Sequence, residues 1–118
     1  MELQASGMLE PAIPENEQER LDTLRQLRIL DTASEKAFDD LARLAAYICD
    51  VPISQVTLVD AKRQWFKASI GLDETETPRR VSFCANAINR PEVMVVDDAR
   101  ADERYYDIPL VTEPTYIR

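Results

Sequence analysis

Two strand-like segments separated by a tight polar turn are the feature that most constrains this fold. Residues 54–60 alternate between two faces, and residues 64–70 do the same after the turn Ala61-Lys62-Arg63. A period of two is typical of a strand with one buried face, and a short polar turn between two such strands favours an antiparallel pair. We therefore predict a hairpin over residues 54–70, with Gly71 at its exit.

Two amphipathic helices are predicted before this hairpin. Residues 15–30 are rich in good helix formers, and their leucines recur every three positions. Residues 35–49 place Phe38, Leu41, Ala45 and Ile48 on one face, which we expect to pack against the domain. The second helix should end at Val51-Pro52, because a residue before proline is pushed away from helical geometry.

The remaining segments are predicted from shorter signals. Pro78 and the polar character of residues 72–80 indicate a loop, and Ser82 could cap a short helix. The other expectations are a short helix over 83–89, a third strand over 93–96, a helical turn over 99–106, and irregular chain after Pro109. Residues 1–14, with Pro11 and Pro14, are predicted to be a flexible leader.

Charge and hydropathy exclude several kinds of partner. The net charge is -8, and residues 1–60 carry 12 acidic against 5 basic side chains. Nucleic acid and anionic membrane surfaces both require clustered lysine and arginine, so neither partner is expected. No apolar stretch approaches the roughly 20 residues of a membrane span, and no secretory signal begins the chain. We expect a cytoplasmic protein.

The chain contains two cysteines, Cys49 and Cys84, and no histidine. A Ser-His-Asp or Cys-His site cannot be built from this chain alone, and zinc normally requires four Cys or His ligands. We therefore predict no metal site, no cofactor and no catalytic residues, and hence no enzyme activity for this segment. Cys49 is expected to be a small buried hydrophobic residue.

Three groups of residues remain candidates for chemistry. Cys84 is placed near a helix start, where a thiol pKa is lowered, although a packing role is the alternative. Five acids between Asp97 and Asp107 lack the EF-hand pattern, so a solvated loop with local ion pairs is favoured over a calcium loop. The aromatic residues are either core or the lining of a ligand pocket.

Several segments in order resemble a known family of sensory modules. The chain is similar to the GAF domains found at the N-terminus of bacterial and cyanobacterial sensor histidine kinases and diguanylate cyclases. The resemblance is carried by Arg20-Leu21-Asp22-Thr23-Leu24, Phe38-Asp39-Asp40-Leu41, Arg63-Gln64-Trp65-Phe66-Lys67, Ser82-Phe83-Cys84-Ala85 and Val95-Val96-Asp97-Asp98-Ala99-Arg100. It covers residues 15–118, which we therefore expect to form one GAF domain.

The resemblance implies an α+β fold with a central antiparallel sheet and flanking helices. Two further strands and a closing helix would follow Arg118 in such a domain, so we expect a truncated module with its C-terminal strands missing. Asn86 stands where many relatives carry a histidine, which argues against a metal or bilin role. The ligand-facing residues implied are Ser82, Phe83, Cys84, Arg104 and Tyr106.

The function implied is sensory. Such a module binds a small molecule, or senses redox state, and passes a conformational signal to an output domain such as a histidine kinase of a two-component system or a diguanylate cyclase. A homodimer through the helix over residues 15–30 is a further expectation. The alternatives are a thiol-dependent free methionine sulfoxide reductase using Cys84, or a pure dimerisation module.

Overall fold

The computed structural model describes residues 10–114 and 117, so the prediction of a flexible leader lies outside the described residues for positions 1–9. The chain divides into two compact units. One unit comprises Glu15–Arg79 and is called here the hairpin unit. The other combines the residues before Glu15 with those from Arg80 onward, and is called the aromatic unit. Each is described by itself.

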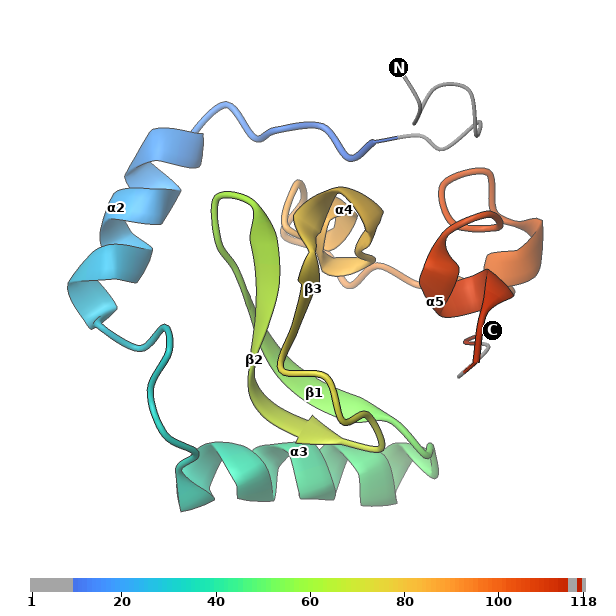
Figure 1. Ribbon diagram of the computed structural model, residues 1–118, viewed down its shortest axis with the longest axis horizontal. Helices are drawn as coiled ribbons and strands as arrows, with labels where there is room; N and C mark the ends of the chain where they lie inside the picture. Colours follow the sequence, from blue (N-terminus) through green and yellow to red (C-terminus); the bar gives the residue numbers. More distant parts are fainter. Residues whose placement is uncertain (1–9, 115–116, 118) are drawn as a thin grey trace. The chain divides into compact units, whose positions relative to one another are not determined.

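The hairpin unit contains a three-stranded antiparallel sheet, as Figure 1 shows. Strands β1 (Ser54–Val59), β2 (Arg63–Ile70) and β3 (Glu76–Pro78) lie in the order β1-β2-β3. The predicted hairpin is confirmed, because β1 and β2 pair antiparallel with Ser54 opposite Ile70 and Val59 opposite Gln64. With helices flanking this sheet, the α+β fold class is confirmed.

Strand β2 is the central strand, and it departs from simple alternation. The pairing register shifts between Val56 and Thr57, which are opposite Ala68 and Phe66, so Lys67 has no direct partner on β1. Residues 64–68 are all buried, on both faces of the strand. The regular two-face pattern predicted for 64–70 is therefore wrong in its middle, because a β-bulge inserts one residue there.

The third strand is not the one predicted. Residues 72–80 were expected to be a loop, but Glu76–Pro78 pairs with β2 at Trp65, Gln64 and Arg63. Pro78 is compatible with this role because β3 is a short edge strand, and the missing N–H of a proline is tolerated at a sheet edge. Gly71 has φ +86°, and a Cβ there would lie 2.1 Å from the carbonyl oxygen of Pro52. Glycine is therefore required at the exit of β2.

Both predicted long helices are present, but the face predicted for residues 35–49 is wrong, because Leu41, Ala45 and Ile48 are exposed. Helix α2 (Glu17–Leu27) buries Leu21 and Leu24, and it ends at Arg28 in the left-handed conformation. Helix α3 (Lys36–Cys49) ends in the same way at Asp50. It packs on β1 and β2, as Figure 1 shows, with Ala42 at the contact.

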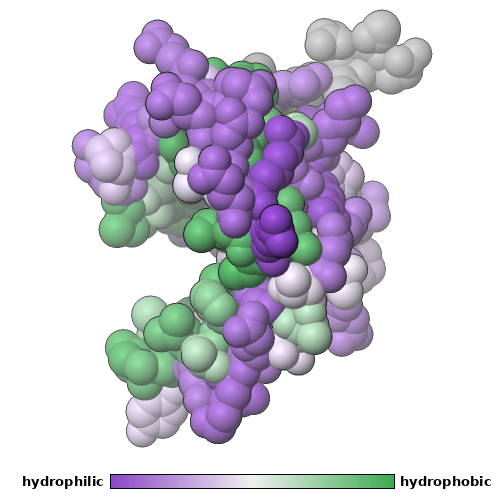
Figure 2. Space-filling model, turned by 90° about the vertical axis from the view of Figure 1, so that its left-hand side faces the viewer, coloured by the Kyte–Doolittle hydropathy of each residue, from purple (hydrophilic) through white to green (hydrophobic). Residues whose placement is uncertain are grey.

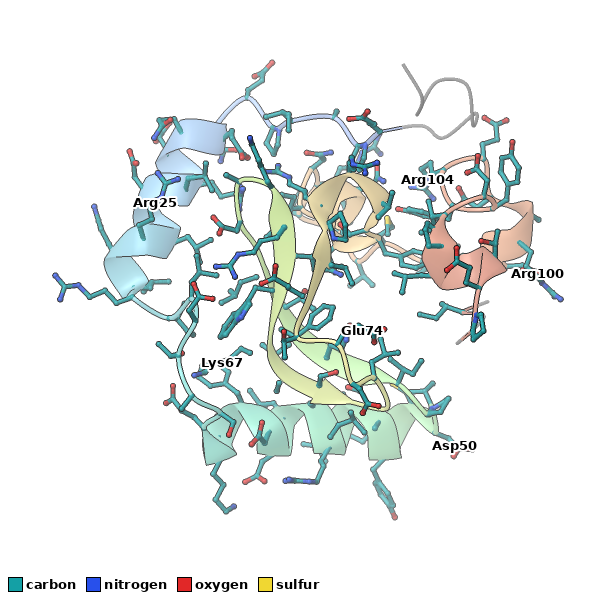
Figure 3. The ribbon with its side chains drawn as sticks, in the orientation of Figure 1. Arg25, Asp50, Lys67, Glu74, Arg100 and Arg104 are labelled. Carbon is teal, nitrogen blue, oxygen red and sulfur yellow. The ribbon has the colours of Figure 1, made fainter. Side chains whose placement is uncertain are left out.

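Two charged residues of β2 hold the chain between α2 and α3. The ammonium of Lys67, whose side chain is fully buried, is 2.7 Å from the Glu35 carboxylate and donates to the Ala33 carbonyl at 2.6 Å. Figure 3 shows Lys67 extending toward this segment. Arg63 makes a two-pronged contact with Asp31 at 2.9 and 2.7 Å. The segment resembling the GAF pattern thus has a structural role in this unit.

The aromatic unit has only short helical elements among its described residues. These are η1 (Arg79–Val81, which begins on the last residue of the hairpin unit), α4 (Cys84–Ala87), η2 (Ala99–Ala101) and α5 (Pro109–Thr112). Its core consists of Ala99, Tyr105, Ile108 and Val111, with Phe83 and Met94 packed against them. The chain after Pro109, predicted to be irregular, instead forms the single turn α5, since proline is well accommodated at a helix start.

The strand predicted over residues 93–96 is absent. The segment keeps a period of two, because Val93 and Val95 are 88% and 74% exposed while Met94 and Val96 pack against the core. No backbone group of these four residues pairs with another backbone group in the described chain. A strand requires a neighbouring strand as well as the right pattern of side chains, and the pattern alone was therefore insufficient.

Candidate functional site

A pocket of about 600 Å³ opens on the aromatic unit. Its polar lining is provided by Asn86 in α4, by Asn89, Arg90 and Glu92 after that helix, and by Arg104. Its apolar lining comes from Val93, Met94 and Val95. A few polar groups that converge beside an apolar wall are the usual composition of a small-molecule site.

Arg104 is held in place at the edge of this pocket. Its backbone N–H and its Nε both donate to Asp102 Oδ1, at 2.9 and 3.0 Å, and its Nη2 donates to Oδ2 at 2.8 Å. These hydrogen bonds lower the pKa of Asp102 and raise the pKa of Arg104. The remaining nitrogen, Nη1, lies 3.6 Å from the Met94 sulfur, a weak acceptor. The guanidinium is therefore oriented, while its Nη1 has no strong acceptor among the residues that the structure describes.

Tyr105 connects the pocket lining to the core. Its ring is 1% exposed, packs against Phe83 at 4.4 Å between centroids, and lies 4.9 Å from the Arg104 guanidinium carbon. Its hydroxyl donates to the Phe83 carbonyl oxygen at 3.5 Å and lies 3.5 Å from the Met94 sulfur, and burial raises its pKa. Two lining residues of the pocket, Met94 and Arg104, thus contact the side chain of Tyr105.

Of the five residues predicted to face a ligand, only Arg104 lines this pocket. Ser82 is 1% exposed, and its hydroxyl accepts a hydrogen bond from the backbone N–H of Ala85, so it caps α4. Phe83 belongs to the packing around Tyr105. The roles of these two residues in binding stay predictions, with a structural role visible for each.

Cys84 and Tyr106 also lie outside the lining of this pocket. Cys84 is the first residue of α4 and is half-buried, whereas Tyr106 is 48% exposed. Cys49, predicted to be buried, is exposed, because the hairpin covers only part of the surface of α3. Neither cysteine is in a disulfide.

The sequence analysis missed most of the residues that line the pocket. Asn86 was noted only as a departure from the family pattern, and Asn89, Arg90 and Met94 were not singled out. The available signal was the pair of amides three residues apart, which a helical turn places on the same side. Because a strand was predicted over residues 93–96, Val93, Met94 and Val95 were not recognised as lining a pocket.

The acidic cluster behaves largely as a surface loop with ion pairs. Asp98 pairs with Arg100 at 2.9 Å and Asp102 with Arg104 at 2.8 Å, and Figure 3 shows Arg100 pointing outward. Asp107 differs, because both its carboxylate oxygens are buried without a hydrogen-bond partner in the described chain. Within residues 10–114 and 117, no three Cys, Asp or Glu side chains gather as a metal site.

Comparison with known proteins relates the chain to a larger one. It is 40% identical over 111 residues to the protein named cyclic di-GMP phosphodiesterase PA2567 of Pseudomonas aeruginosa. The match covers 94% of this chain but 19% of that protein, so the chain spans about a fifth of its relative's length. No family model matches the sequence. No helix in the described part of the chain is long and apolar enough to cross a membrane.

Proposed function

We propose that this chain is a GAF-type regulatory module of a cyclic di-GMP signalling protein. It binds a small molecule at the pocket of the aromatic unit and changes the activity of an output domain. The output domain is an enzyme of cyclic di-GMP turnover, and this segment does not itself catalyse the reaction.

This proposal rests on the sequence match between almost the whole chain and a small part of a phosphodiesterase. Identity of 40% over 111 residues indicates common descent, and common descent supports a common role for the two segments. Because the segment accounts for 19% of the relative, most of that protein lies elsewhere. An accessory role is therefore the simplest assignment for the matched part.

The pocket lining suggests the chemistry of the ligand. Arg90 and the Nη1 of Arg104, which has only the weak Met94 sulfur as an acceptor, suit a carboxylate or phosphate, and the amides of Asn86 and Asn89 can both donate and accept. Met94 and Val95 provide an apolar wall beside them. We infer that the ligand is a small amphiphilic anion, with its charged end at the arginines and its apolar part against residues 93–95.

A route from ligand to core follows from the same contacts. A ligand that attracts Arg104 competes with Asp102 and shifts the guanidinium over Tyr105. A ligand that packs against Met94 disturbs the contact between its sulfur and the Tyr105 hydroxyl. Either change alters the packing of Tyr105 on Phe83, and a signal requires that the ligand favour one of two arrangements.

A chimera tests the regulatory role. This chain would replace the matched segment of the P. aeruginosa phosphodiesterase, and cyclic di-GMP hydrolysis would be compared with that of the parent and of a deletion lacking the segment. We expect the chimera to retain activity and the Arg104→Gln chimera to have an altered basal or metabolite-dependent rate. A chimera indistinguishable from the deletion would contradict the proposal.

The isolated chain provides the control for catalysis. It should not hydrolyse cyclic di-GMP, and measured hydrolysis would contradict the accessory assignment. The alternative of a methionine sulfoxide reductase is tested in the same preparation with free methionine sulfoxide and a thiol reductant. Turnover that Cys84→Ser abolishes would replace our assignment with that enzyme.

A further inference from the structure

Helix α3 carries an apolar stripe that the hairpin unit does not cover. Leu41, Leu44 and Ile48 are 57%, 54% and 69% exposed, and Ala37 on the same side is also exposed. We call these four residues the outer stripe. Figure 2 shows hydrophobic residues at the surface of the lowest part of the view, where α3 lies.

The outer stripe is uncovered because the apolar surface of α3 is wider than its contact with the sheet. The side toward β1 and β2 contains Ala42, which is buried, and Phe38 and Ala46, which are half-buried. The outer stripe lies on a different side, with spacings of four, three and four residues. This spacing is that of a two-helix seam, in which each apolar side chain inserts between residues of a facing helix.

We propose that the outer stripe binds the outer stripe of a second copy of this chain, with the two α3 helices antiparallel. In this arrangement Ala37 of each copy lies opposite Ile48 of the other, and Leu41 lies opposite Leu44. Each small residue faces a large one, and each leucine faces a leucine. The seam is therefore complementary to itself in size, as a twofold interface requires.

The charges of α3 favour the same partner and direction. The chain has a net charge of -8, which opposes self-association, but α3 has two bases and two acids among Lys36, Asp39, Asp40 and Arg43. Its last turn has no basic residue, and Asp50 follows it. Antiparallel pairing brings Lys36 of one copy toward the negative C-terminal end of the other, which is a favourable interaction.

Helix α2 was the dimer helix expected from the sequence. It offers less exposed apolar surface for dimerisation than α3. Leu21 and Leu24 are each 7% exposed, which leaves Leu27, at 65%, as its large exposed hydrophobic residue. A single exposed leucine is common on monomer surfaces. The structure thus shifts the candidate interface from α2 to α3.

Sedimentation equilibrium of the full chain over a concentration series tests the proposal. The wild type should show a monomer–dimer equilibrium. Leu41→Glu and Leu44→Glu should each raise the dissociation constant by at least about tenfold, because a charge then replaces an apolar contact at the seam. The matched control is Leu27→Glu, at a somewhat more exposed leucine on α2, which should leave the constant unchanged.

Two results would overturn the proposal: a wild type that stays monomeric at every concentration, or a Leu27→Glu variant that weakens association as much as Leu44→Glu. Circular dichroism of each variant verifies that it is folded.

Cross-linking tests the direction of the helices without disturbing the fold. In a Cys49→Ser, Cys84→Ser background, the pair Ala37→Cys and Ile48→Cys should give a disulfide-linked dimer under mild oxidation, because those positions lie opposite each other. Leu44→Cys alone should give little, since its partner is Leu41. Efficient dimerisation of Leu44→Cys with none for the pair would overturn the antiparallel arrangement.

Discussion

The two units of this chain are stabilised in different ways. The hairpin unit has three paired strands and two helices of 11 and 14 residues, and it buries charged side chains such as Lys67 and Arg79 in ion pairs with Glu35 and Glu17. In the aromatic unit no described helix is longer than four residues. Its order depends on side chains that pack around Tyr105.

This difference makes the hairpin unit suited to be a scaffold and the aromatic unit suited to respond to a ligand. Backbone ladders and ion pairs distribute the stability of the hairpin unit over many groups, so a small change at one group moves little. The aromatic unit concentrates its packing on one residue, Tyr105, that also contacts the pocket lining through Met94 and Arg104. A ligand at that pocket can therefore act on the core of the less regular unit.

The largest expected effect is on the aromatic core. Tyr105→Ala removes a ring that is 1% exposed, and loss of a buried aromatic typically costs about 3–5 kcal/mol. Amide hydrogen exchange should show protection lost in residues 80–114 before residues 54–70. Tyr106→Ala is the control, since that side chain is 48% exposed and should change stability by about 0.5 kcal/mol or less. Equal loss of protection in both units would remove the contrast drawn above.

An intermediate effect is expected at the exit of the hairpin. Gly71→Ala places a Cβ at positive φ and against the Pro52 carbonyl oxygen, so we expect a loss of roughly 2–3 kcal/mol in urea denaturation. The fluorescence of Trp65, the single tryptophan, reports on this unit. Ala61→Gly in the exposed turn should change stability by about 0.5 kcal/mol or less. If both variants behave alike, the close approach at Gly71 does not matter.

The smallest effect concerns the ion pair between Glu17 and Arg79. Hydrogen bonds from Arg79 lower the pKa of Glu17, whose usual value is 4.5, so its stabilisation is present above that pH and is lost as the pH falls below it. We expect a loss of about 1–2 kcal/mol between neutral pH and the acid range. Glu17→Gln should flatten this part of the pH profile, whereas exposed Glu19→Gln should not. An unchanged profile in Glu17→Gln would show that the pair contributes nothing.

Local periodicity predicted the hairpin and both long helices, because each of those patterns depends on near neighbours in the chain. Periodicity failed to predict the elements whose pairing or contact partner is remote in sequence. The segment around Val95 has the right side-chain pattern for a strand but no neighbouring strand in the described part of the chain, and Glu76–Pro78 forms a strand because it pairs with the free edge of β2. Periodicity also did not predict the bulge at Lys67. This bulge depends on the segment between α2 and α3, to which the Lys67 side chain binds.

The candidate site was predicted only in part, again because its residues are not close neighbours in the sequence. Arg104 was identified through the family resemblance, and the structure places it at the pocket. Asn86, Arg90 and Met94 come together only because the short helix α4 and the unpaired segment after it fold beside the turn that carries Arg104. Such a lining has no fixed spacing in the sequence, so a pattern search could not find it.

The sequence by itself determined the hairpin, the two amphipathic helices and the lack of histidine, because these follow from composition and from contacts between close neighbours, and the α+β class followed from the family resemblance. Only the tertiary structure decided which segment became the third strand, which side of α3 stayed uncovered, and which side chains surround the pocket. Each of these features depends on whether a distant part of the chain covers a given surface. The local sequence pattern does not contain that information.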